Sequence, residues 1–263
     1  MSRKALLIGI NYVGTSSALR GCINDVLNIR EFLINEFKME EDEIIMLTEA
    51  AGSNDLKPTH ANILKYIKWL VNDAKNGDKL FFHYSGHGTH IRDYSGDEND
   101  NQDECICPLD YSKAGLITDD VLRQVLVDVL PKGCNLFGLF DCCHSGTILD
   151  LKYNYLFNSN PSQNTYNTQI EKKSKDTKAD VILLSGCLDN QTSADAWIDR
   201  KSQGAMTYSF LKTYYNLKEK NKTVNCQRLM KDLNVYIKRS RFTQIPKLST
   251  GNMLNLNSKI VIM

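Results

Sequence analysis

The sequence has no excess of charge of either sign, because 32 Lys and Arg residues oppose 31 Asp and Glu residues. A chain with a formal net charge of +1 has no overall field that attracts nucleic acid or an anionic membrane. It also lacks a long apolar run, since residues 4–10 are too few to cross a bilayer and no small-residue cleavage site follows them. We therefore expect no nucleic-acid or membrane partner, a cytoplasmic location with the nucleus left open, and eight cysteines present as thiols.

The composition has none of the biases of a disordered, collagenous or coiled-coil chain. Hydrophobic residues make up 42% and charged residues 24% of the 263 residues, so the chain can bury a core. Domains average roughly 150 residues, which leaves one large domain or two small ones open. We expect one compact enzyme domain.

Short apolar runs alternate with longer segments of helical spacing, a pattern typical of a parallel sheet with crossover helices. The predicted strands are residues 4–10, 43–47, 79–84, 135–140 and 180–184, with a sixth candidate at 259–263. The predicted helices are residues 23–37, 63–71, 205–215 and 226–239. The sequence therefore predicts an α/β fold.

Two polar stretches interrupt this alternation. Residues 93–110 are rich in Asp and Glu and predict a solvated acidic loop. Residues 152–178 are rich in Asn, Ser, Thr, Gln and Lys, and they are longer than the plain connections of a compact domain. We expect this second stretch to be a mobile, protease-accessible loop.

Residues able to carry out nucleophilic chemistry follow two of the predicted strands. His87 lies between Gly86 and Gly88, and these glycines indicate a sharp turn that leaves the imidazole uncovered. Cys142 and Cys143 follow the strand at residues 135–140. Ligands of open α/β sheets bind beyond the carboxyl ends of the strands, where an imidazole can lower the pKa of a thiol and later protonate a leaving amine. Periodicity alone does not choose between the two cysteines.

Most of the other cysteines and one histidine favour structural roles. We expect burial as small hydrophobic side chains for Cys22, Cys134, Cys187 and Cys226. His83 lies within a predicted strand, and we assign it to structure as well.

Familiar metal motifs are excluded by spacing. Zinc is not favoured, because neither Cys105-x-Cys107 nor Cys142-Cys143-His144 has the spacing of a structural zinc site. The acidic loop is not an EF-hand, since Gln102 stands where the turn glycine is needed. Carboxylates from separate loops could still hold a hard divalent cation such as calcium, and the candidates are Asp103, Asp119, Asp120 and Asp150. Asp119 and Asp120 also fit the start of a helix.

Three segments together resemble the metacaspases of the caspase-like clan. They read Gly21-Cys22-Ile23-Asn24-Asp25, His83-Tyr84-Ser85-Gly86-His87-Gly88 and Asp141-Cys142-Cys143-His144-Ser145-Gly146. Residues 96–98, 102–104, 117–120, 146–151 and 184–196 extend the resemblance over essentially the whole chain and to the type I, single-chain branch. The resemblance implies a caspase-like fold, with a mostly parallel central sheet flanked by helices. Its single peptidase domain would comprise a large part at 1–151, a polar processing loop at 152–178 and a small part at 179–263.

The resemblance also implies the catalytic roles. It assigns His87 as the general acid and base, Cys143 as the nucleophile, and the backbone amides of Gly88 and Cys143 as the oxyanion hole. Cys142 aligns with a position that is often Ser in the family. This departure leaves open a second nucleophile or an oxidation partner.

The primary specificity pocket implied by the resemblance is lined by Asp25, Ser85 and Asp141. Carboxylates in such a pocket pair with Arg or Lys, so the expected partners are proteins or peptides with Arg or Lys at the cleavage position. An aspartate-specific protease does not fit an acidic pocket.

Members of this branch are typically calcium-dependent, and the matching carboxylates are again Asp103, Asp119, Asp120 and Asp150. Autoprocessing is expected after Lys175 and Lys178, and dimerisation is not expected, so the protein would be a monomer. The resulting hypothesis is a calcium-activated cysteine endopeptidase. The alternative is a catalytically weak scaffold in protein quality control or partner binding.

Overall fold

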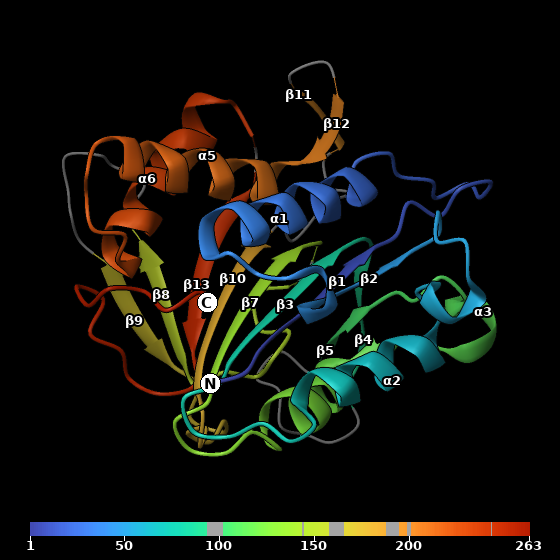
Figure 1. The fold of residues 1–263 in the computed structure, drawn as a ribbon, viewed down its shortest axis with the longest axis horizontal. Helices are drawn as coiled ribbons and strands as arrows, with labels where there is room; N and C mark the ends of the chain where they lie inside the picture. Colours follow the sequence, from blue (N-terminus) through green and yellow to red (C-terminus); the bar gives the residue numbers. More distant parts are fainter. Residues whose placement is uncertain (94–101, 144, 158–165, 188–194, 199–200, 243) are drawn as a thin grey trace.

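The computed structural model describes residues 1–93, 102–143, 145–157, 166–187, 195–198, 201–242 and 244–263, with side chains described for all of these except residues 187, 195–198 and 201. A twisted sheet forms the centre of the molecule (Figure 1). Its strand order is β2 (Ile44–Thr48), β1 (Arg3–Gly9), β3 (Lys79–Ser85), β7 (Asn135–Asp141), β10 (Asp180–Cys187), β13 (Ile245–Thr250), β8 (Tyr153–Phe157) and β9 (Tyr166–Ile170). The strands from β2 to β10 are parallel, whereas β13, β8 and β9 extend the sheet by antiparallel pairing.

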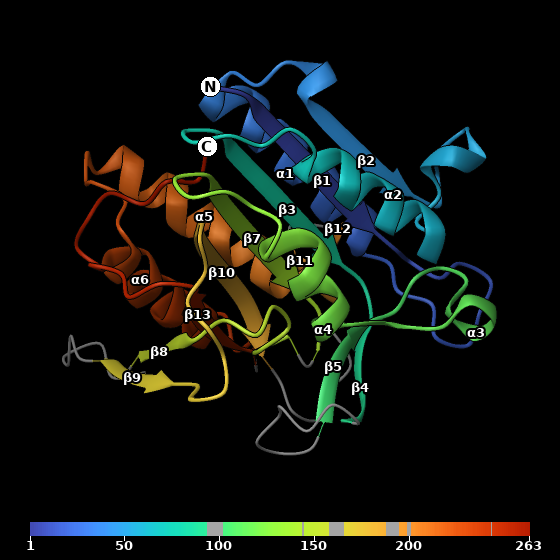
Figure 2. The same ribbon diagram turned by 90° about the horizontal axis from the view of Figure 1, so that it is seen from below.

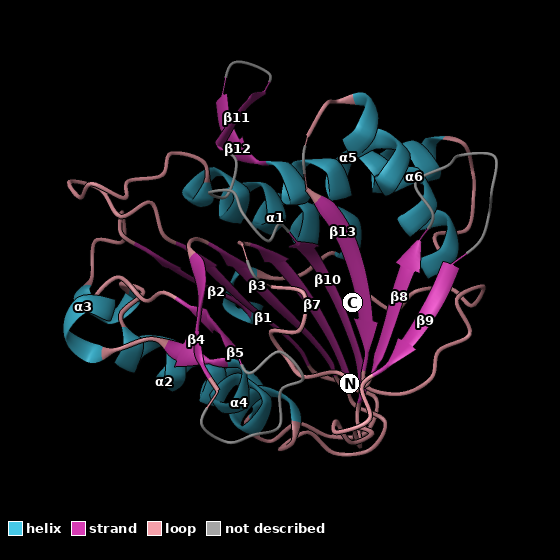
Figure 3. Cartoon of the chain, turned by 180° about the vertical axis from the view of Figure 1, so that it is seen from behind, coloured by secondary structure: helices cyan, strands magenta, loops and turns pink. Residues whose placement is uncertain are grey.

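Helices cover both faces of the sheet (Figures 1 and 3). One face carries α1 (Cys22–Phe37), α5 (Ala205–Glu219) and α6 (Cys226–Arg239). The other carries α2 (His60–Val71), α4 (Asp119–Leu122) and the π-helical turn Arg123–Val127 that continues α4, as the view from below shows (Figure 2). The remaining elements are α3 (Tyr111–Ala114), the 3-10 turns Glu41–Glu43 and Asn54–Leu56, a small sheet of β4 (Gly88–Arg92), β5 (Gln102–Ile106) and β6 (Ile117–Thr118), and the hairpin of β11 (Asp195–Ile198) and β12 (Lys201–Gly204).

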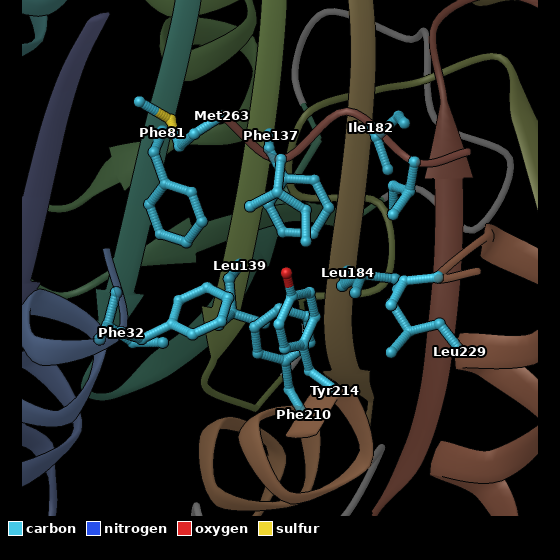
Figure 4. Close-up of a cluster of buried hydrophobic side chains, with 14 of the residues drawn as sticks. Phe32, Phe81, Phe137, Leu139, Ile182, Leu184, Phe210, Tyr214, Leu229 and Met263 are labelled. Atoms are coloured by element: carbon cyan, nitrogen blue, oxygen red, sulfur yellow. The ribbon is translucent and has the colours of Figure 1, made fainter. Parts of the chain in front are cut away.

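Alternation of side chains along the central strands divides the core into two halves. On β7, Phe137 and Leu139 face α1 and α5, whereas Leu136 and Phe140 face α2 and α4. Figure 4 shows the first half, where Phe137 lies close to Phe210 of α5. Because both faces are buried, each central strand is apolar along its length, which is why the strands can be recognised as short apolar runs.

The predicted architecture is confirmed. The five predicted strands between residues 4 and 184 are β1, β2, β3, β7 and β10, with ends within one residue except that β10 continues to Cys187. All four predicted helices form, with α6 at its predicted bounds and α5 continuing to Glu219. Three of the cysteines predicted to be structural, Cys22, Cys134 and Cys226, are buried, whereas the side chain of Cys187 lies outside the described residues.

The strand predicted at residues 259–263 is wrong. Lys259 makes an isolated bridge with Asn225, and Ile260 and Ile262 are buried in the core without belonging to a described strand. The sheet is completed instead by β13, in which Pro246 removes a backbone donor and so hides the strand from pattern reading.

The acidic stretch at residues 93–110 is only partly a loop. Residues 94–101 lie outside the described residues, but β5 follows them and pairs with both β4 and β6. Asp103 and Cys105 on β5 are buried. The prediction assumed that acidic residues are solvated, but the Asp103 carboxylate lies inside the protein.

The stretch at residues 152–178, predicted as a mobile, protease-accessible loop, contains two strands among its described residues, whereas residues 171–178 belong to no helix or strand. Residues 158–165 lie outside the described residues, and the flanking strands β8 and β9 pair at the edge of the main sheet. The signal was hidden because every side chain of β9 is exposed and the centre of β8 buries a polar residue, Asn154. The Ser249 hydroxyl donates to Asn154 Oδ1 at 2.6 Å and satisfies it.

His83 has the structural role predicted for it. The side chain is fully buried, and its Nδ1 lies 2.9 Å from the Leu139 carbonyl oxygen. Burial lowers the pKa of His83 from 6.5 to about 4. The folded protein therefore keeps this imidazole neutral where the unfolded chain would take up a proton.

Replacing His83 by Leu should remove part of the acid sensitivity of the fold. The depressed pKa means that stability is fully present above pH 6.5 and is lost as the pH falls towards 4, by up to about 3 kcal/mol. Urea unfolding at several pH values should show this decline in the wild type and a flatter profile in His83→Leu. Equal slopes for both proteins between pH 6.5 and 4 would contradict the assignment.

Candidate active site

The pairing of β3 with β7 brings the two predicted catalytic segments together. The strands are parallel and in register, with Ser85 opposite Asp141 at their carboxyl ends. His87 and Cys143 each follow two residues later, so the chain carries both to the same edge of the sheet. Gly88 packs directly against Cys143, because a Cβ at residue 88 would lie only 2.0 Å from the Cys143 carbonyl oxygen.

His87 is half-buried and is oriented by a backbone carbonyl. Its Nε2 lies 2.7 Å from the carbonyl oxygen of Ser17, and its ring lies 4.7 Å from that of Tyr12, measured between centroids. An imidazole that donates from Nε2 to this carbonyl keeps Nδ1 as the nitrogen available for proton transfer. This orientation suits a general base.

The glycines that flank His87 are required by close approach and not by a special turn. Neither Gly86 nor Gly88 has the positive φ found at four other described glycines. A Cβ at Gly86 would lie 2.7 Å from the Tyr84 hydroxyl oxygen. The chain does bend at Gly86, as predicted, but these glycines are needed for close packing and not for a positive φ.

The two adjacent cysteines differ in burial. Cys142 is 1% exposed, and burial, together with the neighbouring Cys143 thiol, raises its pKa well above 9. A thiol that resists ionisation is a poor nucleophile. Cys143 is 9% exposed and lies just beyond β7, against Gly88. The geometry favours Cys143, a choice that periodicity left open.

The three predicted pocket residues converge on the face of the sheet covered by α1 and α5. The Ser85 hydroxyl donates to Asp25 Oδ2 at 2.7 Å. The N–H of Gly204, at the end of β12, donates to Asp25 Oδ1 at 2.8 Å. A Cβ at Gly204 would stand 2.2 Å from Asp141 Oδ2 and 2.5 Å from Asp25 Oδ2, so both carboxylates pack closely against Gly204. Two buried carboxylates so close together are suited to a cationic side chain.

Asp141 is held by residues that the sequence did not single out. Its Oδ2 accepts the Thr207 N–H at 2.7 Å, and its Oδ1 accepts the Gln244 amide at 3.3 Å. Burial nevertheless raises the pKa of Asp141. Gly204, Thr207 and Gln244 carry no local motif that marks them, because each acts on a carboxylate far away in the sequence.

The predicted calcium ligands lie in two neighbouring places. Asp103 on β5 and Asp119 at the start of α4 are buried, and Asp119 accepts the Glu104 N–H at 2.6 Å. Asp120 and Asp150 line a cavity of about 580 Å³ beside α4. Carboxylates suit a hard cation in kind. Within the described residues, however, no three Asp, Glu, His or Cys side chains converge closely enough to hold a metal ion.

The alternative role of Asp119 as a helix start is confirmed. The α4 helix begins at Asp119, and the Thr118 hydroxyl accepts the Val121 N–H at 3.3 Å as an N-terminal cap.

The segment with the predicted processing lysines is fastened to the body of the protein. Arg123 donates from Nη2 to the Lys175 carbonyl at 3.2 Å, from Nη1 to the Asp150 carbonyl at 2.8 Å, and from Nε to the Asp128 carboxylate at 2.7 Å. The next residue, Asp176, forms an ion pair with Lys152 at 3.0 Å. Lys178 is exposed, and the N–H of Thr177 before it donates to the Gly251 carbonyl at 3.3 Å.

Comparisons with known proteins point to one family. The family model of the metacaspase, peptidase C14 domain matches residues 3–152. Metacaspase-1 of Meyerozyma guilliermondii is 35% identical, over 99% of this chain and 72% of that protein. Metacaspase-1 of Schizosaccharomyces pombe is 36% identical, over 99% of this chain and 70% of that protein.

A solved structure supports the fold alone. The crystal structure of protein GSU0716 from Geobacter sulfurreducens aligns with a TM-score of 0.67 over 98% of both chains, at 22% identity. Fold and family together define a cysteine-type peptidase with a caspase-like fold. The chain belongs to the metacaspase family. The described residues include no helix that is both long and apolar enough to cross a membrane.

Replacing Asp141 by Asn should stabilise the fold and weaken the pocket. Because burial raises the pKa of Asp141, the ionised carboxylate destabilises the folded state as the pH rises through that pKa. Asn can still accept the Thr207 N–H, and its amide can donate to Gln244 Oε1, which has no hydrogen-bond partner among the described residues, once the Gln244 amide turns over.

The expected result is a higher free energy of unfolding for Asp141→Asn at neutral pH, with a gain that shrinks as the pH falls. Urea unfolding between pH 4 and 8 measures this. If the carboxylate binds a cationic substrate side chain, cleavage of an Arg or Lys reporter should fall about tenfold to hundredfold, since a charge-assisted hydrogen bond is lost. A variant that is less stable than the wild type across this pH range would contradict the assignment of the penalty to the buried charge.

Proposed function

We propose that this protein is a monomeric endopeptidase that cleaves proteins and peptides after Arg or Lys, using Cys143 and His87, and that calcium activates it. The observation that carries the proposal is the in-register pairing of β3 with β7. That pairing sets Gly88 against Cys143 and Ser85 beside Asp141, so one strand pair supports both a reaction centre and a pocket.

The reaction follows from the two side chains. The Cys143 thiolate attacks the scissile carbonyl carbon and forms a C–S bond, while the carbonyl oxygen becomes an oxyanion that the N–H groups of Gly88 and Cys143 stabilise. The His87 imidazolium then protonates the leaving nitrogen as the C–N bond breaks. Water attacks the thioester carbonyl carbon while His87 accepts a proton from it, and the C–S bond breaks, which releases the carboxylic product and restores the Cys143 thiolate and the His87 imidazolium. The half-buried position of His87 and its contact with Ser17 support this role.

Charge supports the preference for Arg or Lys. Asp25 and Asp141 are both fully or almost fully buried, and both lie against Gly204. A guanidinium or ammonium group offsets this concentration of negative charge, whereas an aspartate side chain would add to it. The electrostatics of the pocket therefore oppose the specificity of an aspartate-specific protease.

Calcium activation rests on the carboxylates near the reaction centre. Asp103, Asp119, Asp120 and Asp150 are the proposed ligands, and because no three of these side chains converge among the described residues, the ion would have to draw them together. Glu104, between Asp103 and Cys105 on β5, supports a link to the active site, because its Oε2 accepts the Thr147 N–H at 2.7 Å. Thr147 lies in the loop that follows Cys143, so a change at β5 can reach the nucleophile.

Matched peptide reporters ending in Arg, Lys or Asp test the proposed function, with calcium and with a chelator. We expect calcium-dependent hydrolysis after Arg and Lys, and a loss of about a thousandfold or more in Cys143→Ala. Cys142→Ser is the matched control and should retain activity, since Cys142 is buried with a raised pKa. Activity that survives in Cys143→Ala but not in Cys142→Ser would reverse the assignment.

Calcium binding needs a readout of its own. Calorimetry on the inactive Cys143→Ala protein should detect binding that weakens in Asp120→Asn and persists in Asp55→Asn, whose carboxylate lies on an exposed turn remote from α4. Correctly folded protein that cleaves no reporter under any condition would favour the scaffold alternative.

Autoprocessing after Lys175 and Lys178 belongs to the same proposal. For Lys175 the scissile carbonyl is the one that Arg123 holds, so cleavage there requires this hydrogen bond to open. Arg123 is therefore expected to protect the bond after Lys175.

Arg123→Ala should expose that bond. In the Cys143→Ala background, which removes self-cleavage, limited digestion with trypsin should cut after Lys175 about tenfold faster in Arg123→Ala, because a charge-assisted hydrogen bond is lost. Mass spectrometry of the first fragments measures the rate. Arg30→Ala is the control, since it also removes an arginine paired with a carboxylate, Glu41, but on α1. Equal rates in the two variants would contradict a protective role.

A further inference from the structure

Two buried tyrosine hydroxyls meet beneath His87. Tyr12 follows β1 and Tyr84 lies on β3, and their hydroxyl oxygens are 3.2 Å apart. Both rings belong to the core half that faces α2 and α4, the side opposite the pocket carboxylates. The mechanism derived above uses neither hydroxyl.

These hydroxyls form hydrogen bonds with the backbone groups of two residues, His87 and Cys107. Tyr12 accepts the N–H of His87 at 3.1 Å and donates to the Cys107 carbonyl at 2.6 Å. Tyr84 donates to the His87 carbonyl at 2.8 Å and accepts the N–H of Cys107 at 3.2 Å. Each hydroxyl has one proton to donate, and this arrangement uses each proton once.

The surroundings leave this arrangement little freedom. A Cβ at Gly86 would lie 2.7 Å from the Tyr84 hydroxyl and 3.1 Å from that of Tyr12, so the chain between Tyr84 and His87 must pass directly over the pair. Tyr12 has a φ of 51°, in the left-handed region. The Glu49 carboxylate fixes this backbone by accepting the N–H groups of Tyr12 and Val13, each at 2.9 Å.

We propose that Tyr12 and Tyr84 are positioning residues for His87: their hydroxyls clamp the N–H and the C=O of the His87 backbone and so set the place from which its imidazole reaches Cys143. The inference rests on the proposed role of His87 as the general acid and base. The imidazole itself makes contact with Ser17 and with the Tyr12 ring, so both the backbone and the ring of His87 are held.

Burial makes the clamp, meaning the Tyr12 and Tyr84 hydroxyls with their hydrogen bonds to the His87 backbone, independent of pH over the working range. It raises the pKa of Tyr12 and of Tyr84 well above 10, so both hydroxyls keep their protons. A change in the pH profile of a tyrosine variant must then come from His87 and Cys143, and not from titration of the clamp.

The test uses Tyr12→Phe and Tyr84→Phe, which keep the rings and remove only the hydroxyls. With an Arg reporter we expect kcat to fall about tenfold to hundredfold in each variant while KM stays within about twofold, since substrate binding lies on the other face of the sheet. The pH dependence of kcat/KM should shift, and so should the pH dependence of Cys143 alkylation by iodoacetamide, which needs no peptide turnover.

Tyr155→Phe is the matched control. Tyr155 is also buried, and its hydroxyl accepts a backbone N–H, that of Leu254 at 3.0 Å, but it lies on β8, next to the edge strand β9. It should lose comparable stability in urea unfolding and keep the wild-type kcat and pH profiles. If Tyr12→Phe and Tyr84→Phe behave as Tyr155→Phe does, the clamp is structural only and the proposal is overturned.

His87→Ala separates this failure from failure of the proposed function. If His87→Ala retains wild-type turnover, the assignment of the general base is wrong and the positioning proposal falls with it. If His87→Ala is inactive while both tyrosine variants are unaffected, only the positioning proposal fails.

Discussion

The register of β3 against β7 is the constraint on which the rest of the site depends. Side chains alternate along a strand, so Ser85 and Asp141 point to the face with α1 and α5, whereas Tyr84 points to the opposite face. The pocket and the tyrosine pair are therefore two sides of the same strand ends. A slip of one residue would exchange the faces, turning Tyr84 towards the pocket and Ser85 towards the clamp. The apolar runs on both faces of the central strands fix the register through the two halves of the core.

The pocket stores unfavourable energy that a substrate can relieve. Asp25 and Asp141 are removed from water beside Gly204, and burial raises the pKa of Asp141 despite the donors Thr207 and Gln244. A cationic side chain gains from this arrangement twice, through the hydrogen bonds it donates and through the repulsion it screens. The same carboxylates would repel an anionic side chain. In the proposed function, specificity would then come as much from rejecting an anionic side chain as from binding a cationic one.

Much of the fold could be read from the sequence, because burial on both faces leaves parallel strands as apolar runs and leaves helices with one apolar side. Four of the strands that escaped prediction are ones in which buried positions are not all apolar or in which the backbone pattern is interrupted: β5 buries Asp103, β8 buries Asn154, β13 contains Pro246 and β9 buries nothing. At the site, His87 and the cysteine pair Cys142 and Cys143 follow strands and could be found from that position, whereas the choice of Cys143 came from the family resemblance. Gly204 and Gln244 could not, because their partners lie on other strands and helices and no short-range pattern records such contacts.

The two halves of the reaction centre are held in different ways. His87 is fixed from both sides, by the Tyr12 and Tyr84 hydroxyls on its backbone and by the Ser17 carbonyl on its ring. Cys143 follows the end of β7, in a loop that Ser145 ties down by donating to the Cys142 carbonyl at 2.9 Å and that Thr147 ties to β5 through Glu104. The histidine side is thus set by the core, whereas the cysteine side depends on the acidic β5 and α4 region. In the proposed function, calcium acting on these acidic side chains would therefore adjust Cys143 while His87 stays in place.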